Sequence, residues 1–127
     1  MKKMFLFFSH DLTQIQKNEA KNNLYIKEFI SLDDELQEIW SSIPSDEESL
    51  KEYLKPLKKF LEERASLGDV ILIQGDFGAV YSMVNFAKSL GLKAVYATTK
   101  RTVEEIVEDG KTIKKSIFEH RRFREYE

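Results

Sequence analysis

Cysteine is absent from this chain of 127 residues, and histidine occurs only twice. Without cysteine the chain forms no disulfide, has no thiolate nucleophile and offers no thiolate ligand to a metal ion. The two histidines, His10 and His120, lie far apart in the sequence and show no metal-ligand spacing. We therefore predict no metal site, and the composition is compatible with a reducing compartment.

Long hydrophobic runs are also missing. No apolar segment approaches the roughly 18 residues that a membrane-spanning helix requires. The first eight residues contain two lysines and a short apolar run, but Ser9, His10 and Asp11 follow after only five apolar residues, which is too few for a signal peptide. We expect a cytoplasmic protein that makes no membrane contact, with this first apolar segment as a buried strand.

The chain nevertheless has enough apolar material for a core, because 42% of its residues are hydrophobic and nine are Phe. Its length suits one domain over residues 1–127. Four short, mainly apolar segments predict strands, at 4–8, 25–30, 69–74 and 92–97. Four segments with helical spacing separate or flank them, at 13–22, 32–40, 45–67 and 79–90.

Several end signals support this division. Thr13 with Gln16 and Ser45 with Glu48 have the spacing of capping boxes, and Ser31 is placed to cap the second helix. Pro56 is expected to kink the third helix. Asp109-Gly110 predicts a two-residue turn between 102–108 and 111–118, with 120–126 continuing the second hairpin strand. The order predicts an α/β fold, a Rossmann-like parallel sheet with helices on both faces and a C-terminal β-hairpin.

Polar clusters follow three of the predicted strands, at the end where open α/β sheets bind their ligands. The first cluster, Ser9-His10, follows the first strand. The second, Gln74-Gly75-Asp76-Phe77-Gly78, follows the third strand, and the third cluster, Thr98-Thr99-Lys100-Arg101, follows the fourth strand. Because the carboxyl ends of parallel strands meet at one edge, we predict that the three clusters form a single anion-binding rim. Ser9-His10 could equally contain a hydrogen-bonded structural histidine, Gln74–Gly78 could be an ordinary tight turn, and Thr98–Arg101 could be an exposed strand end.

The residue types in these clusters suit phosphate. Gly75 and Gly78 let backbone N–H groups approach an anion at the start of a helix, and Thr98 to Arg101 supply two hydroxyls and two cations. The glycine spacing matches neither G-x-G-x-x-G nor a P-loop, so neither NAD nor ATP is predicted as a cofactor.

Charge is unevenly distributed along the chain, although the net charge is only −2. Residues 28–63 carry −7, whereas residues 110–124 carry +5. Strand alternation would place His120, Arg122 and Arg124 on one face, where they could clamp phosphates or pair with the acidic region. The low net charge argues against general RNA binding, and we expect no binding to duplex nucleic acid.

Four segments resemble a known family over nearly the whole chain. FLFFSH, ILIQGDFGA, YATTKR and HRRFREY are similar to segments of the Csx-twenty family, small proteins of type III CRISPR loci. The resemblance implies a Rossmannoid domain akin to the CARF domains that sense cyclic oligoadenylates. It also implies a homodimer with ring-nuclease activity that cleaves cyclic tetra-adenylate and switches off the antiviral response.

The reaction implied by the resemblance needs no metal, because a ribose 2′-hydroxyl attacks the adjacent phosphorus and leaves a 2′,3′-cyclic phosphate and a 5′-hydroxyl. In this hypothesis Gln74 to Gly78, Thr98 and Thr99 hold the phosphates, and Lys100 and Arg101 stabilise the transition state. Ser9 and His10 orient the ribose or relay a proton, and His120, Arg122 and Arg124 are further ligand candidates. Two alternatives stay open: a sensor or sponge that binds the ring without cleaving it, and a structural module whose basic hairpin contacts RNA or an acidic protein.

Overall fold

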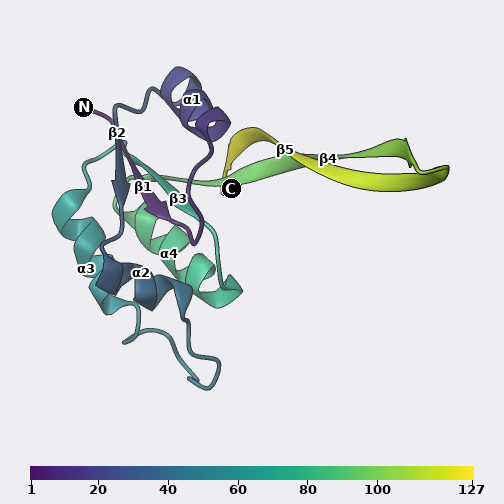
Figure 1. Ribbon diagram of the computed structural model, residues 1–127. Helices are drawn as coiled ribbons and strands as arrows, with labels where there is room; N and C mark the ends of the chain where they lie inside the picture. The colour runs from purple at the N-terminus through teal and green to yellow at the C-terminus, as the bar shows by residue number, and fades with distance from the viewer.

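The computed structural model describes residues 1–127 as a mixed α/β protein built on one five-stranded sheet (Figure 1). The strand order is β2-β1-β3-β4-β5, with β1 to β4 parallel and β5 antiparallel to β4. The strands are β1 (Lys3–Phe7), β2 (Glu28–Ser31), β3 (Val70–Ile73), β4 (Lys93–Glu108) and β5 (Lys111–Glu125). The helices are α1 (Gln14–Asn23), α2 (Asp34–Ser41), α3 (Lys55–Arg64) and α4 (Phe77–Ser89). None of these helices is long and apolar enough to cross a membrane.

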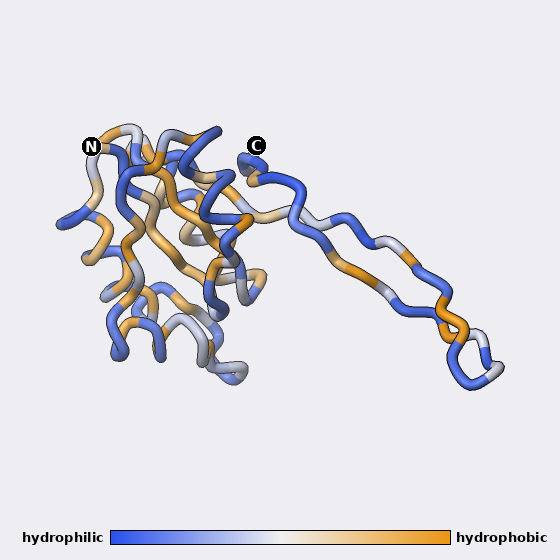
Figure 2. The backbone as a smooth tube through the Cα atoms, turned by 45° about the horizontal axis from the view of Figure 1, so that its top comes forward, coloured by the Kyte–Doolittle hydropathy of each residue, from blue (hydrophilic) through white to orange (hydrophobic).

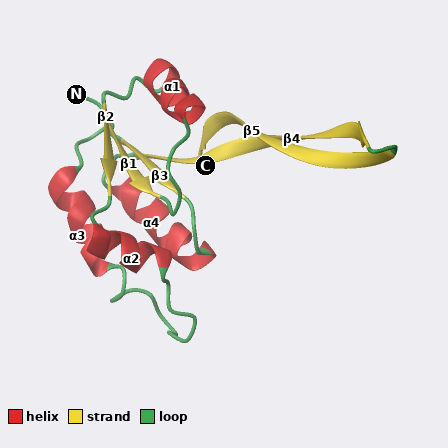
Figure 3. Ribbon diagram, viewed as in Figure 1, coloured by secondary structure: helices red, strands yellow, loops and turns green.

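Helices cover both faces of the sheet, but unequally (Figure 3). Alternate residues of the central strands point to opposite faces, so Phe5, Phe7 and Ile73 join one core with α2, α3 and α4. Met4 and Leu72 point the other way and pack with Phe123 and residues of the α1 segment in a smaller core. The continuous apolar runs that predicted the strands are therefore explained by burial on two faces.

Strand and helix ends follow local chemistry, which confirms some predictions and corrects others. The capping box of Thr13 and Gln16 is present at the start of α1. The second helix is capped by Asp33, whose carboxylate accepts from the N–H of Leu36, so the prediction of Ser31 was wrong. Ser31 instead ends β2, which begins at Glu28 and not at Tyr25, because Tyr25 has a positive φ of 59°.

The third helix is shorter than predicted. It begins at Lys55, and Pro56 lies in its first turn. A backbone N–H in that turn has no acceptor within the helix, so proline removes no helical hydrogen bond there. The capping box predicted at Ser45 and Glu48 does not form, and no kink is needed. Residues 42–54 make an irregular loop that is anchored by Leu54, which is fully buried, and by the Tyr53 hydroxyl, which donates to the carbonyl oxygens of Ile39 and Ser42.

The largest departure is the length of β4. It does not end at Thr98–Arg101, as predicted, but continues to Glu108 as one strand of a hairpin that projects from the body (Figure 2). We call residues 98–120 the arm. Its turn, Asp109-Gly110, has φ of 53° and 73°, as a two-residue hairpin turn requires, which confirms that prediction. Beyond Ala97 the only strand that pairs with β4 is β5, because β3 ends at Ile73; at the base of the arm His120 also contacts Glu19 of α1.

A β-bulge at the base of the arm changes which side chains share a face. Thr98 pairs with Arg122 but Thr99 pairs with His120, so Arg121 is an extra residue on β5. His120 therefore turns to the α1 side, where its ring lies 4.8 Å from that of Phe123. The prediction that His120 shares a face with Arg122 and Arg124 was wrong for this reason.

Candidate functional site

The strand order places a topological switch point between the carboxyl ends of β1 and β3, and we call this part of the sheet edge the crevice. These strands are neighbours in register, with Phe7 opposite Ile73. The connection after β1 leads to α1 on one face of the sheet, whereas the connection after β3 leads to α4 on the other. In open α/β sheets, ligands bind where neighbouring strands part in this way. Two of the three predicted clusters, Ser9-His10 and Gln74–Gly78, flank this switch point, but the hollows beside them are separate.

Ser9 is held from the α2 side. Its hydroxyl lies 3.0 Å from that of Ser41, and the Gln37 side-chain amide donates to both the Ser41 hydroxyl and the carbonyl oxygen of Phe8. Ser9 and His10 are both exposed, so this small network fixes the end of β1 while leaving its polar groups accessible.

The turn after β3 already has partners within the protein. Gln74 Oε1 accepts from the N–H of Ala97 at 2.6 Å, and the Gln74 carbonyl accepts from Trp40 Nε1 at 3.1 Å. A Cβ on Gly75 would lie 3.3 Å from the Trp40 ring, so this glycine is needed for close packing whether or not an anion binds. Asp76 caps α4 by accepting from the N–H of Ala79 at 3.0 Å.

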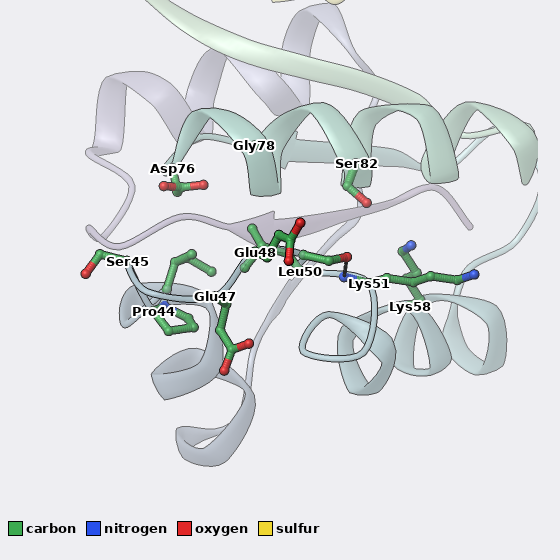
Figure 4. A pocket seen from close by; sticks show the side chains of 12 residues that line it. Pro44, Ser45, Glu47, Glu48, Leu50, Lys51, Lys58, Asp76, Gly78 and Ser82 are labelled. Carbon is green, nitrogen blue, oxygen red and sulfur yellow. Dashed lines mark hydrogen bonds between the residues drawn. The ribbon is translucent and has the colours of Figure 1, made fainter.

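An acidic groove of about 650 Å³ lies on the α4 side of this turn (Figure 4). Asp76, Gly78 and Ser82 form its α4 wall, and the opposite wall comes from the loop before α3 and from α3 itself, including Glu47, Glu48, Ser49, Lys51 and Lys58. Three carboxylates face two ammonium groups here, which disfavours phosphate on this side of the crevice. Phe77, the first residue of α4, is 95% exposed.

A second cleft opens on the α1 side, around His10. Two adjoining hollows of about 610 and 420 Å³ share Phe8, His10, Asp11 and Gln37. Ser9 and Ser41 line the smaller hollow. The larger one extends between α1 and β2 and is also lined by Leu6, Leu12, Lys17, Lys21, Phe29, Ser31 and Leu32. We call the two hollows together the His10 cleft.

The His10 cleft contains residues that the sequence argument missed. The side chain of Lys17 is followed four residues later by that of Lys21, so both lie on the same side of α1 and reach the cleft. Phe8 and Phe29 supply half-buried aromatic rings from neighbouring strands, and the Phe8 ring lies 5.4 Å from the His10 ring. The i, i+4 lysine pair on a predicted polar helix was the available signal.

The third predicted cluster only begins at the crevice. The N–H of Ala97 is hydrogen-bonded to the Gln74 side chain, so Ala97 lies beside the end of β3. Thr98 is therefore at the rim, and the residues after it lie progressively further out on the arm. Arg101 is about 10 Å beyond Thr98 at 3.3 Å per residue. Its guanidinium donates to the Ser116 hydroxyl through Nε and Nη2, while Thr99 and Lys100 are exposed.

The three predicted β5 residues are separated by the bulge. Arg124 lies over the Tyr96 ring and donates to its hydroxyl at 3.1 Å, and the Arg122 backbone is bonded to Thr98 Oγ1. His120 is buried against α1, with Nε2 2.6 Å from a carboxylate oxygen of Glu19. Arg122 and Arg124 thus remain near the rim, whereas His120 is part of the joint between α1 and the arm.

Two tyrosines with raised pKa values act as structural donors beside these regions. Burial, followed by the neighbouring Tyr96, raises the pKa of Tyr126, whose hydroxyl donates to the Ile73 carbonyl at 2.7 Å. Desolvation, followed by the nearby Glu38 carboxylate, raises the pKa of Tyr53. No group of three or more His, Asp or Glu side chains is arranged to hold a metal ion.

The fold and the crevice define a small mixed α/β protein with polar residues at the carboxyl ends of its parallel strands. Comparison with known proteins places the chain in a family: it belongs to the Uncharacterized protein MJ1673 family, whose model matches residues 2–124. The chain is 55% identical to Uncharacterized protein MJ1673 of Methanocaldococcus jannaschii over 126 residues, which cover 99% of this chain and 98% of the relative. No solved structure matches the chain.

Proposed function

We propose that this protein is a cytoplasmic ring nuclease of type III CRISPR signalling, which binds cyclic tetra-adenylate and cleaves it without a metal. The observation that carries the proposal is the His10 cleft, where an imidazole, two lysines and two aromatic rings meet beside the β1–β3 crevice. The sequence resemblance supplies the identity of the ligand. The strand order supports assigning the fold to the Rossmann-like class.

Binding in the His10 cleft would use two kinds of contact. Phe8 and Phe29 offer faces or edges for adenine, and base–aromatic stacking contributes about 1–3 kcal/mol per base. Lys17 and Lys21 offer ammonium groups for phosphate oxygens. Because the groove beyond Asp76 is acidic, we place the phosphates nearest the body on the His10 side.

The chemistry follows from the ligand itself, because the nucleophile and the leaving group both belong to it. The 2′-oxygen forms a bond to phosphorus, the bond from phosphorus to the 5′-oxygen breaks, and a proton moves from the former oxygen to the latter. In the proposal His10 accepts or returns that proton, and Ser9 orients the ribose. Lys100 and Arg101, on the arm, neutralise charge on the part of the ring that extends beyond Thr98.

The cyclic ligand also supports a homodimer, since a ring of four identical nucleotides presents two-fold symmetry to two copies of one cleft. A single copy offers a cleft on one side of the crevice, so a second copy would hold the other half of the ring.

The test is to incubate the purified protein with labelled cyclic tetra-adenylate in the presence of EDTA. We expect linear products that end in a 2′,3′-cyclic phosphate. His10→Ala should lower the cleavage rate by roughly a hundredfold or more, as for loss of a general acid–base group. Lys21→Ala should weaken binding, whereas Lys88→Ala, an equal charge change in the last turn of α4, should change neither.

Three results separate the alternatives. Tight retention of an intact ring, unaffected by His10→Ala, would assign the protein as a binder or sponge. Failure to bind any cyclic oligoadenylate, together with salt-sensitive RNA binding, would favour the interaction module. Cleavage that is abolished by EDTA would contradict the metal-independent step.

A further inference from the structure

The outer edge of β4 in the arm has no partner. From Thr98 to Glu108 its neighbour on one side is β5, and on the other side no strand follows, because β3 pairs only with Lys93 to Val95. An unpaired strand of this length exposes a row of N–H and C=O groups that readily pairs with another strand. At 3.3 Å per residue the free edge is about 36 Å long.

The other edge of the arm is protected, and the edge of β4 is not. β5 contains three lysines in the arm, Lys111, Lys114 and Lys115, and the bulge at Arg121 interrupts the regular pairing of this strand. Lysines and bulges are the features that prevent strand edges from pairing. Along β4 the segment 98–108 has one lysine, Lys100, near its base, and it has no proline and no bulge of its own.

The arm is also electrically balanced and partly apolar. Residues 100–119 contain five acidic and five basic side chains, so the arm as a whole is not a basic surface of the kind that binds a nucleic-acid duplex or an anionic membrane. Several of its apolar side chains are exposed, including Val103 at 56%, Val107 at 75% and Phe118 at 65%. Two strands projecting alone are only marginally stable in water, so added pairing would stabilise the arm.

The sequence of the free edge is complementary to itself. Antiparallel pairing of the whole segment 98–108 with its copy places a two-fold axis at the middle residue, Val103. Around that axis Arg101 lies opposite Glu105 of the copy, and Lys100 lies diagonal to Glu104. None of these four groups forms an ion pair within the chain. Shifting the axis to Arg101, Glu104 or Glu105 would instead oppose like charges, which is destabilising.

We propose that two copies of this chain associate through the outer edges of their β4 strands, with Val103 on the two-fold axis, to form a continuous four-stranded ribbon. The occupant of the free edge is therefore a second copy of the same chain. In this pairing Glu108 and the Asp109-Gly110 turn of each copy reach Thr98 at the rim of the other. Each crevice would then be bordered by residues of two copies.

The absence of native cysteine gives a direct test. In the proposed register two copies of Val103 are directly opposite, with Cα atoms about 4.5–5.5 Å apart, a separation that a disulfide spans. The variant Val103→Cys should oxidise to a covalent dimer at low micromolar concentration. The control Ile106→Cys places the two sulfurs on residues about 20 Å apart, and it should remain monomeric on a denaturing gel. Equal crosslinking of the two variants would overturn the register.

A charge test measures the association without a covalent bond. Sedimentation of the unmodified chain should show a dimer. Glu105→Lys, which would oppose Arg101, should weaken dimerisation at least tenfold, and the double exchange Arg101→Glu with Glu105→Lys should restore it. Thr112→Lys adds a charge on β5, away from the edge, and should leave the dimer intact. A monomer at all concentrations, or equal effects of Glu105→Lys and Thr112→Lys, would overturn the proposal whether or not cyclic tetra-adenylate is cleaved.

Discussion

Glu19 is expected to be the most sensitive position in the joint between α1 and β5. One of its carboxylate oxygens accepts from the N–H of Phe123 at 2.9 Å and lies 2.6 Å from Nε2 of His120. The side chains are only 14% exposed for Glu19 and 5% for His120. Nδ1 of His120 is buried without a partner, so the carboxylate is the one polar contact that this imidazole has within the chain.

Replacing Glu19 by Ala leaves two buried polar groups without a partner. An unsatisfied buried donor costs about 1–3 kcal/mol, so the loss should be about 2–5 kcal/mol of the free energy of unfolding. That is a large part of the ~5–15 kcal/mol that stabilises a domain. Glu19→Gln keeps an oxygen acceptor of the same shape for Phe123 and should cost about half as much.

Urea unfolding, followed by far-ultraviolet circular dichroism, measures these differences. Glu62→Ala is the matched control, because Glu62 is exposed in α3 and forms no ion pair, so its removal should change the free energy of unfolding by less than about 0.5 kcal/mol. Hydrogen exchange at the amide of Phe123 gives a local measurement and should accelerate in Glu19→Ala. If Glu19→Ala is as stable as Glu62→Ala, the Glu19 carboxylate does not stabilise the joint between α1 and the arm.

Three further predictions concern the turn after β3 and the end of β5. Gly75→Ala should destabilise the protein by about 1–3 kcal/mol in urea unfolding, because the new Cβ would lie 3.3 Å from the Trp40 ring and the ring would have to shift; an unchanged midpoint would contradict this packing. Asp76→Ala should cost about 1 kcal/mol by removing the cap of α4, and Asp76→Asn should retain most of it, as thermal unfolding would show. The pKa of the Tyr126 hydroxyl is raised in the folded state, so its contribution to the free energy of unfolding is complete below pH 10 and is lost as pH rises further. Tyr126→Phe should lower the free energy of unfolding by about 1 kcal/mol at neutral pH, and this free energy should then fall less steeply at alkaline pH.

The parts of the fold that were predictable are those decided by local patterns. The apolar runs of β1 and β3 indicated burial on both faces, and Thr13 with Gln16 located the start of α1. Asp109-Gly110 located the hairpin turn. For the cap and the turn the deciding interaction lies within a few residues of the signal, and for the two strands the continuous apolar pattern is itself local although the burial that it indicates is not.

The errors arose where distant contacts decide the structure. Pro56 is compatible both with a kinked helix and with a first turn, and the burial of Leu54 favours the second. Nothing in Thr98 to Arg101 reveals that β4 continues, because its partner lies on β5 some twenty residues later. The bulge at Arg121 likewise follows from the register of that pairing.

The candidate site was predictable in position but only partly in composition. The general rule for parallel strands placed Ser9, His10 and the turn after β3 together. It could not show that Gln74, Gly75 and Asp76 are bonded to or packed against Ala97, Trp40 and α4, or that Lys17 and Lys21 reach the cleft from α1.

The central place of β1 also has a kinetic consequence. Lys3 pairs with Glu28, 25 positions along the chain, whereas Met4 pairs with Val70, 66 positions along. Loop-closure entropy makes the longer connection about 0.9 kcal/mol more costly to form, or a factor of roughly four to five in population. We therefore expect the β1–β2 pair to form first during folding. The other edge of β1 then stays unpaired until β3 pairs with it.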